Sequence, residues 1–269
     1  MDPWREVGDG VFVRRYAFFD QDIGAILGDG AGLVIDTRTT YAQARELVED
    51  LSALRPGPDH VWIVVNTHFH FDHTFGNAVF RGAEIWGHER CVDMLRDHGE
   101  EMRDAVAAAM PDLAPELGEV EIVAPGRTVG DRGTIDVGGR RVELRYLGRA
   151  HTDNDLLILV PDASVAFAGD MIEQGAPPSF GDAFPLEWPD TLRAMLPLLN
   201  GPVVPGHGEV VDAAFVEAQL EEIEAAASAV RAAHAEGVGV AEAAARVPFP
   251  PAVGRDVAER AYAQLDGHI

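Results

Sequence analysis

The segment Thr67-His68-Phe69-His70-Phe71-Asp72-His73, at residues 67–73, places three imidazoles and one carboxylate within six positions. In extended backbone, side chains two positions apart share a face, so His68 and His70 can bind one ion together. A turn then brings Asp72 and His73 to a second ion. Imidazole nitrogens and carboxylate oxygens suit zinc, at roughly 2.0–2.2 Å. A lone histidine is usually structural, but four such residues in the order HxHxDH indicate a metal site.

Strands and loops around this stretch point to the same edge of a sheet. The β-branched run VWIVVN at 61–66 predicts a buried strand that ends just before His68. His151 follows a predicted strand at 141–147, Asp170 ends SVAFAGD, and His207 lies in PVVPGHG. Glycine neighbours let the backbone bend, and open α/β sheets place their sites at the carboxyl ends of strands.

The rest of the chain alternates between strand and helix patterns. Thr40 and Gln43 have the spacing of a capping box, which opens an amphipathic helix that 55–58 should end. A second long helix is predicted from about Glu89 to Met110. Further strands are predicted at 11–19, 23–27, 32–37, 83–87, 134–137, 155–160, 164–170 and 202–208, and further helices from 188 through 199 and over a stripe from Val216 to Val230. This order predicts two sheets between helical layers.

The order HxHxDH, then His, then Gly-Asp, then Gly-His resembles the metallo-β-lactamase superfamily, and the match runs across nearly the whole chain. The resemblance implies an α/β sandwich with the αββα fold, in which two mixed β-sheets pack face to face and helices cover both outer faces. We expect one such domain over residues 1–269, with 213–269 as its helical C-terminal part.

The resemblance also assigns metal ligands. His68, His70 and His151 would hold a first metal, and a second would be held by Asp72, His73 and His207. Asp170 would bridge the two. Two Zn²⁺ ions per chain are the expected cofactors, although iron and manganese accept the same ligands.

An aspartate at position 170 matters for the reaction. In the true β-lactamase branches the equivalent residue is typically cysteine or serine, whereas glyoxalase-II-like thioesterases and many lactonases keep aspartate. The resemblance therefore implies a metallohydrolase in which a metal-bound hydroxide attacks an ester-like carbonyl, in a thioester or lactone and less favourably in a β-lactam. Asp72 would be the catalytic residue that orients this hydroxide and passes a proton to the leaving group.

Other functions on the same fold remain open. A persulfide dioxygenase would hold one iron on two histidines and an aspartate, and it would not need His73 or His207. A metallo-β-lactamase proper is a further alternative. A nuclease is disfavoured, because a formal charge of −24 with no lysine repels phosphate backbones.

Candidates around the site are less specific. Phe180, Phe184 and Trp188 lie in a loop that follows Asp170, and we expect them to form an apolar substrate pocket. Tyr16, Phe18 and Phe19 are further pocket candidates. For hydrogen bonds to the outer nitrogens of the ligand imidazoles, the candidates are Asp36, Thr67, Asp153 and Asp155.

Composition sets the remaining expectations. The 269 residues include a single cysteine, Cys91, which excludes a disulfide framework. The sequence begins without a secretory signal pattern and has no apolar run that could span a bilayer, so we expect a soluble cytoplasmic protein. A small-molecule substrate is expected, with neither nucleic acid nor membrane as partner. The oligomeric state is left open.

Overall fold

The computed structural model describes residues 3–54 and 61–269. The expected end of the first helix at 55–58 lies outside these residues. In the described part the strands form one twelve-stranded sheet. Its first half contains β1 (Arg5–Gly8), β2 (Val11–Tyr16), β3 (Gln21–Leu27), β4 (Ala31–Ile35), β5 (Val61–Val65), β6 (Glu84–His88) and β7 (Arg127–Val129).

The second half contains β8 (Arg132–Val137), β9 (Arg140–Tyr146), β10 (Leu156–Val160), β11 (Val165–Glu173) and β12 (Val203–His207). The two halves meet where β3 lies beside β12, through the single antiparallel pair of Gln21 and His207. Both halves are mixed: β4, β5, β6 and β7 run parallel, as do β11 and β12, and the other neighbours are antiparallel. The two expected sheets are thus the halves of one sheet joined at a single pair.

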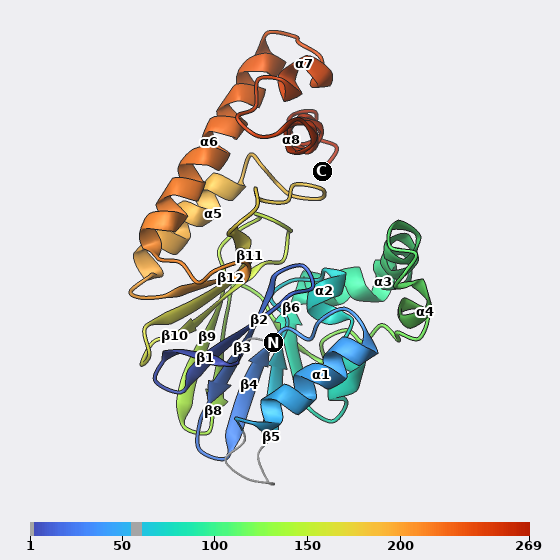
Figure 1. Ribbon diagram of the computed structural model, residues 1–269. Coiled ribbons are helices and arrows are strands. Elements are labelled where there is room, and N and C mark those ends of the chain that lie inside the picture. Colours follow the sequence, from blue (N-terminus) through green and yellow to red (C-terminus); the bar gives the residue numbers. More distant parts are fainter. Residues whose placement is uncertain (1–2, 55–60) are drawn as a thin grey trace.

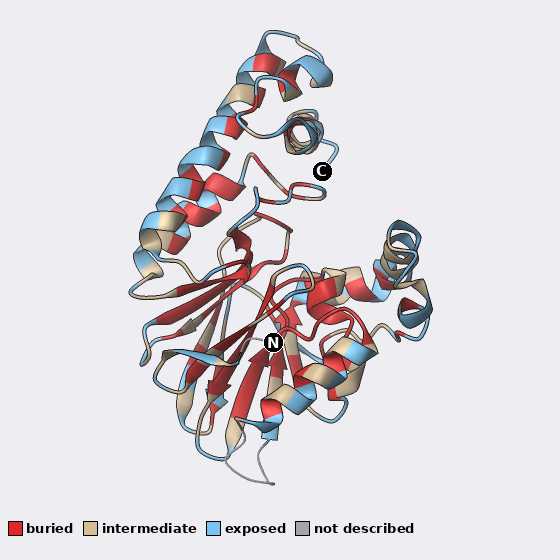
Figure 2. Ribbon diagram, in the orientation of Figure 1, coloured by how far each residue is buried: buried red, intermediate tan, exposed pale blue. Residues whose placement is uncertain are grey.

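The two halves pack face to face over an apolar core. Side chains from both halves are fully or almost fully buried there, including Val11, Val13, Ile26, Leu33, Ile135, Val142, Leu144, Ile158 and Phe167. Figure 2 shows these strands as the most buried part of the molecule. Because a sheet half buried on one face still has an apolar second face, each half needs a helical cover.

Helices cover both outer faces, which confirms the expected fold (Figure 1). The first half carries α1 (Tyr41–Ser52), whose Leu47 and Leu51 pack against Val34 and Val64. Beside it lie α2 (Phe71–Thr74), the short η1 (Asn77–Phe80), α3 (Glu89–Ala109) and α4 (Ala114–Leu117). The second half is covered by α5 (Trp188–Met195) with η2 (Leu196–Leu198) and by α6 (Ala213–Ala235). The last two helices, α7 (Val240–Ala244) and α8 (Pro251–Leu265), pack against the end of α6 that points away from the sheet (Figure 1). The residues from 213 onward, expected to be helical, contain α6, α7 and α8.

The capping box at α1 is displaced by one residue from the expected form. The Thr40 hydroxyl accepts a hydrogen bond from the Gln43 backbone N–H at 3.3 Å, as expected. The Gln43 side chain, however, accepts from the N–H of Thr39 rather than that of Thr40. The box still satisfies two backbone donors near the helix start.

Several elements differ from the expected ones. The first strand ends at Tyr16, because Phe19 and Asp20 adopt left-handed backbone conformations that turn the chain into β3. In contrast, β11 continues past Asp170 to Glu173. The short strands β1 and β7 and the helix α4 were not anticipated, and α7 and α8 were expected only as part of a helical region without bounds of their own.

Two neighbouring residues of α1 allow a matched test of its packing. Leu47 is fully buried, whereas 42% of Val48 is exposed. We expect Leu47→Ala to lower the free energy of unfolding by about 2–5 kcal/mol through lost burial and a cavity. Val48→Ala should change it by no more than about 0.5 kcal/mol. Urea denaturation of both variants measures the difference, and equal effects would contradict the packing of α1 described above.

Candidate metal centre

The HxHxDH stretch forms the link between β5 and α2. The chain leaves β5 at Val65, and the N–H of Thr67 donates to Asp36 Oδ1 at 2.8 Å. The turn then starts α2 at Phe71, so Asp72 and His73 project from its first turns. His68 and His70 lie before this turn and Asp72 and His73 lie after it. The sequence-predicted division into two pairs is therefore present.

The structure brings the seven predicted ligands together in two groups. The first group joins His68 Nε2, His70 Nδ1 and His151 Nε2: the Nδ1 of His70 lies 3.0 Å from His68 Nε2 and 2.9 Å from His151 Nε2. Asp170 Oδ2 completes it, 3.5 Å from His151 Nε2 and 3.7 Å from His68 Nε2.

The second group surrounds the other side of the same carboxylate. Asp72 Oδ2 lies 3.4 Å from both His73 Nε2 and His207 Nε2. Asp170 Oδ1 is 3.3 Å from His73 Nε2, and Asp170 Oδ2 is 3.3 Å from His207 Nε2. Asp170 therefore stands between the two groups, at the position expected of a bridging ligand.

Two atoms in the middle of the site are buried without a hydrogen-bond partner in the described structure, namely His73 Nε2 and Asp170 Oδ1. Buried polar groups are almost always hydrogen-bonded, because leaving one unpaired costs free energy. A cation between these atoms would satisfy both. The donor set of imidazole nitrogens and carboxylate oxygens fits zinc, and it equally accepts iron or manganese.

The close approach of strands at Asp170 depends on glycine. A Cβ atom on Gly206 would overlap the Oδ1 atom of Asp170. Gly208 has φ of +102°, and a side chain there would also meet the Gln174 carbonyl. The two glycines beside His207 thus let β12 present its imidazole directly against the carboxylate on β11.

Two of the outer imidazole nitrogens have the partners that the sequence suggested. His73 Nδ1 lies 2.8 Å from Asp36 Oδ2, and His68 Nδ1 lies 3.0 Å from the Thr67 hydroxyl. The same hydroxyl donates to Asp36 Oδ2 at 2.8 Å, so one carboxylate fixes both rings. Asp36 holds this position with a left-handed backbone, φ 68°. Such partners set the tautomer and the orientation of ligand imidazoles.

The other three partners escaped sequence reasoning. His70 Nε2 lies 2.9 Å from Asp182 Oδ2. His151 Nδ1 is 3.1 Å from the Ser179 carbonyl, and His207 Nδ1 is 2.7 Å from the Phe19 carbonyl. Backbone carbonyls leave no signal in a sequence, and Asp182 sits in a loop where aspartate is common. With these contacts, every imidazole of the two groups has a defined orientation.

Asp182 is itself held from the C-terminal helices. Arg260 on α8 donates from Nη2 to the Asp182 carbonyl at 2.7 Å and from Nε to the Ala183 carbonyl at 2.8 Å. Its guanidinium also lies over the ring of Phe184. A chain of direct contacts therefore runs from α8 through the loop to His70.

Electrostatics differ between the two groups. Burial lowers the pKa of His68 well below its usual value and that of His151 to about 4, so both rings are neutral at pH 7. Burial also acts against the charged form of His207, but Asp170 and Asp72 raise its pKa to about 11. The pKa of His73 likewise rises because Asp72, Asp170 and Asp36 outweigh its burial. Without metal, the second group therefore carries protons.

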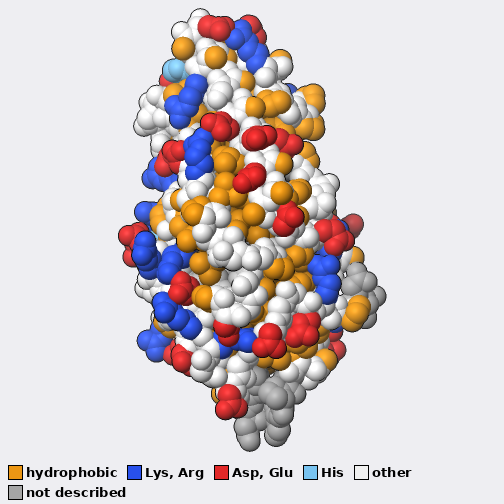
Figure 3. Space-filling view, turned by 90° about the vertical axis from the view of Figure 1, so that its left-hand side faces the viewer, with side chains coloured by type: hydrophobic (Ala, Val, Ile, Leu, Met, Phe, Trp, Pro, Cys, Tyr) orange, Lys and Arg blue, Asp and Glu red, His pale blue; other side chains and the backbone are white. Residues whose placement is uncertain are grey.

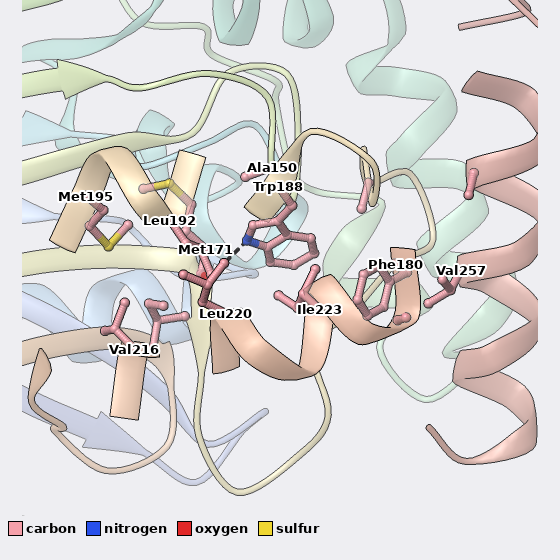
Figure 4. Close-up of a cluster of buried hydrophobic side chains, with 14 of the residues drawn as sticks. Ala150, Met171, Phe180, Trp188, Leu192, Met195, Val216, Leu220, Ile223 and Val257 are labelled. Carbon is pink, nitrogen blue, oxygen red and sulfur yellow. Dashed lines mark hydrogen bonds between the residues drawn. The ribbon is translucent and has the colours of Figure 1, made fainter. Parts of the chain in front are cut away.

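Most of the aromatic residues that we expected to form a substrate pocket lie in the hydrophobic core. Phe180 and Trp188 are buried in the apolar cluster between β11 and helices α5, α6 and α8, where the Trp188 indole donates to the Met171 carbonyl at 3.2 Å (Figure 4). These two side chains offer no surface to a substrate; Trp188 instead backs the His151 ring, with centroids 5.9 Å apart. Phe184 is half-buried under two guanidinium groups. Apolar residues that follow Asp170 in sequence thus point mainly away from it.

The other candidates have structural roles. Asp155 accepts from the N–H and hydroxyl of Thr152 at 2.7 and 2.9 Å, which closes the turn after His151. Asp153 contributes its carbonyl as acceptor to Arg90. His88 accepts from the Arg90 N–H at the start of α3. Cys91 is free and buried on α3, where burial raises the pKa of its thiol.

On the face shown in Figure 3, arginine side chains are interspersed with acidic ones around a middle zone of apolar side chains. Among the arginines of the chain, Arg193 pairs with both Asp190 and Glu224. This face carries no unbroken basic track of the kind that follows a nucleic-acid backbone. Within the described residues, no helix combines the length and apolar character needed to cross a membrane.

The fold and the two facing histidine–aspartate groups define the chain as a candidate metalloenzyme, and comparison with known proteins gives its family. The profile described as the metallo-beta-lactamase superfamily matches residues 17–207. This chain belongs to the metallo-β-lactamase superfamily and is a metallohydrolase of that superfamily. The matched region starts just before β3 and ends at His207, so it contains all seven predicted ligands.

Known relatives differ in their activities. A metallo-beta-lactamase type 2 of Bacillus sp. (strain 170) is 25% identical over 195 residues, covering 70% of this chain and 67% of that protein. The acyl-coenzyme A thioesterase MBLAC2 of Bos taurus is 23% identical over 187 residues, covering 64% and 67%. Among solved structures, a stereoselective inverting sec-alkylsulfatase of Pseudomonas sp. has a similar fold. The structural match covers 100% of this chain and 51% of the sulfatase chain, with a TM-score of 0.80 and 16% sequence identity.

The charge state of the second group predicts a proton-linked metal affinity. His207, with a pKa of about 11, is protonated at pH 7 and must lose that proton to bind a cation. We expect metal binding to release protons and the apparent affinity of the second group to rise with pH. Calorimetric titration of the apoprotein in buffers of different ionisation enthalpy counts the protons. Binding without proton release would contradict this charge assignment.

The link from α8 to His70 predicts a metal-affinity effect at a distance. Removing the carboxylate in Asp182→Ala should weaken metal binding by about 10- to 100-fold, because His70 loses its orienting partner. Arg260→Ala should weaken it less, since only the loop is released. Arg255→Ala, an exposed arginine on the same helix, is the matched control. Competition with a chromogenic chelator measures the affinities; equal affinities for all three variants would exclude the link.

Proposed function

We propose that this metallohydrolase uses two metal ions, zinc in the first instance, to hydrolyse an ester-like carbonyl in a thioester or a lactone. The observation that carries the proposal is the Asp170 carboxylate, which lies 3.3–3.7 Å from two histidines of each group: His68 and His151 in the first, and His73 and His207 in the second. His68, His70 and His151 would hold one ion, and Asp72, His73 and His207 the other, with Asp170 between them.

Two ions at this place would supply Lewis-acid polarisation of a carbonyl oxygen and a water of lowered pKa. The protein's own residues supply the rest. Asp36 and Asp182 hold His73 and His70 in fixed orientations. The two carboxylates of the site are almost fully buried, since Asp72 and Asp170 are each only 6% exposed. Burial of this kind strengthens every charge interaction with the reacting group.

Asp72 is the proposed catalytic residue. The pKa of its carboxyl lies well below the ordinary value: burial acts to raise it, and His73 and His207 more than compensate. Its Oδ2 atom faces both imidazoles at 3.4 Å, so the carboxylate is ionised and fixed in place. We assign to it the acceptance of a proton from the attacking water and its delivery to the leaving group. A thiolate that leaves from a thioester is weakly basic and needs this proton less. An alkoxide that leaves from a lactone is more basic and needs it more.

The choice of substrate class rests on Asp170 and on the relatives together. Aspartate at this position favours the thioesterase and lactonase side of the superfamily, and one relative is named an acyl-coenzyme A thioesterase. The relatives named metallo-beta-lactamases keep lactam hydrolysis as the second candidate. A small substrate with a neutral acyl group is also compatible with a chain of formal charge −24, because such a group is not repelled by negative charge. Its one cysteine is free, which fits a reducing compartment such as the cytoplasm.

A panel of substrates tests the proposal. Zinc-loaded protein should contain about two ions per chain and hydrolyse thioesters or lactones faster than a chromogenic cephalosporin or a secondary alkyl sulfate. Asp72→Ala should lower the rate by at least about 100-fold, the lower end of what a proton-transfer residue contributes. Asp112→Ala, an exposed aspartate between α3 and α4, should leave it unchanged.

Other outcomes point elsewhere. Preferential turnover of the cephalosporin would place the chain with the β-lactamases. One iron per chain with oxygen consumption and no hydrolysis would overturn the proposal in favour of a dioxygenase of the persulfide type.

A further inference from the structure

A cavity of about 240 Å³ lies between the HxHxDH stretch and α3. From α3 it is lined by Met94, His98 and Met102, which are four residues apart and so share one face of the helix. From the HxHxDH stretch it is lined by Phe69, which precedes α2, and by Phe71, the first residue of α2. We call it the α2–α3 pocket. Its walls are mainly aromatic rings and thioethers, and the thioethers adapt readily to flexible apolar groups.

The pocket shares a wall with the candidate metal centre. His70 lines the pocket, and the same ring directs its Nδ1 atom to His68 Nε2 and His151 Nε2 at 3.0 and 2.9 Å. A group in the pocket is therefore separated from the first ligand group by one imidazole. Apolar surface beside reacting atoms is the usual place for the part of a substrate that does not react.

The charge at the pocket wall restricts what can enter. Asp182 also lines the pocket, and its Oδ2 atom lies 2.9 Å from His70 Nε2. A carboxylate group at the pocket wall repels an anionic end group. His98, at the exposed side, is paired with Glu101 at 3.2 Å. A neutral chain suits these walls and a negatively charged one does not.

We propose that the α2–α3 pocket binds the acyl chain of the substrate, and that the enzyme prefers a neutral, apolar chain of medium length. This inference rests on the proposed function, because it names the acyl group of the ester-like substrate. At about 30 Å³ for each water-sized group, the cavity holds roughly six to eight methylene groups. The pocket thus sets chain-length preference, while the two ligand groups act on the carbonyl.

Binding of reaction-product analogues tests the pocket without catalysis. Zinc-loaded protein is titrated calorimetrically with butanoate, hexanoate, octanoate and dodecanoate. We expect the Kd to fall by up to about fourfold for each added methylene until the pocket is full, and then to level off. Suberate, a dicarboxylate with the chain length of octanoate, should bind at least about tenfold more weakly than octanoate because of Asp182.

Matched variants locate the effect. Met102→Trp fills the pocket and should abolish the dependence on chain length, whereas Met110→Trp, at the end of α3 and outside the pocket lining, should preserve it. Met94→Gln keeps the side-chain length but adds polarity, so it should reduce the gain per methylene even if Met102→Trp folds poorly. Zinc content of each variant is measured alongside and should not change.

The two proposals fail in different ways. A chain-length dependence lost in Met102→Trp, without hydrolysis of any ester or thioester, supports the pocket and overturns the proposed function. Hydrolysis of short esters with a Kd independent of chain length overturns the pocket alone. A dependence that Met102→Trp and Met94→Gln both leave intact places the chain elsewhere and also overturns it.

Discussion

The burial of the Asp170 carboxylate is the constraint on which the rest of the site depends. An ionised carboxylate that is 6% exposed is stable in a protein only when positive or hydrogen-bonding groups surround it. The chain provides imidazoles from the β5–α2 link, the β9–β10 loop and the end of β12. It also provides a glycine, Gly206, where any side chain would overlap the carboxylate. The two sheet halves are joined through the pair of Gln21 and His207, and His207 is also a member of the second ligand group. The same residue therefore links the sheet halves and contributes to the site.

The C-terminal helices contribute to this arrangement although they lie outside the matched family region. Trp188 and Phe180 pack against α6 and α8 and so fix the loop that follows β11. Arg260 then ties two carbonyls of this loop to α8, and Asp182 in the loop reaches His70. Ligand imidazoles need such support because a small error in ring orientation weakens metal binding. The helical part therefore acts on the centre through the loop, without contributing a ligand of its own to the two groups.

A feature of this chain could be predicted from the sequence when the residues that form it lie close together in the chain. The HxHxDH pattern, the buried run before it and the glycine-flanked His207 are all readable within a few residues, and the structure brings their side chains together. Asp182 and the carbonyls of Ser179 and Phe19 could not be found this way, because only the tertiary fold aims them at an imidazole. The side on which Phe180 and Trp188 face was equally undetermined, since a loop has no periodicity. Short edge strands such as β1 and β7 contain too few residues for an alternating pattern to stand out.

The two ligand groups are chemically unequal, and this inequality links metal binding to stability. In the first group, His68 and His151 are neutral because they are buried, and they offer free lone pairs, whereas Asp182 raises the pKa of His70 against the effect of its burial. In the second group, Asp72 and Asp170 hold protons on His73 and His207, and these protons compensate two buried carboxylates when no cation is present. A cation that replaced the protons would bind the folded chain, because the seven proposed ligands converge only there. Its binding would add to the free energy of unfolding in proportion to the logarithm of its concentration over Kd. The formal charge of −24 thus has a counterpart in the interior, where the buried carboxylates of Asp72 and Asp170 favour the cations that the proposed chemistry requires.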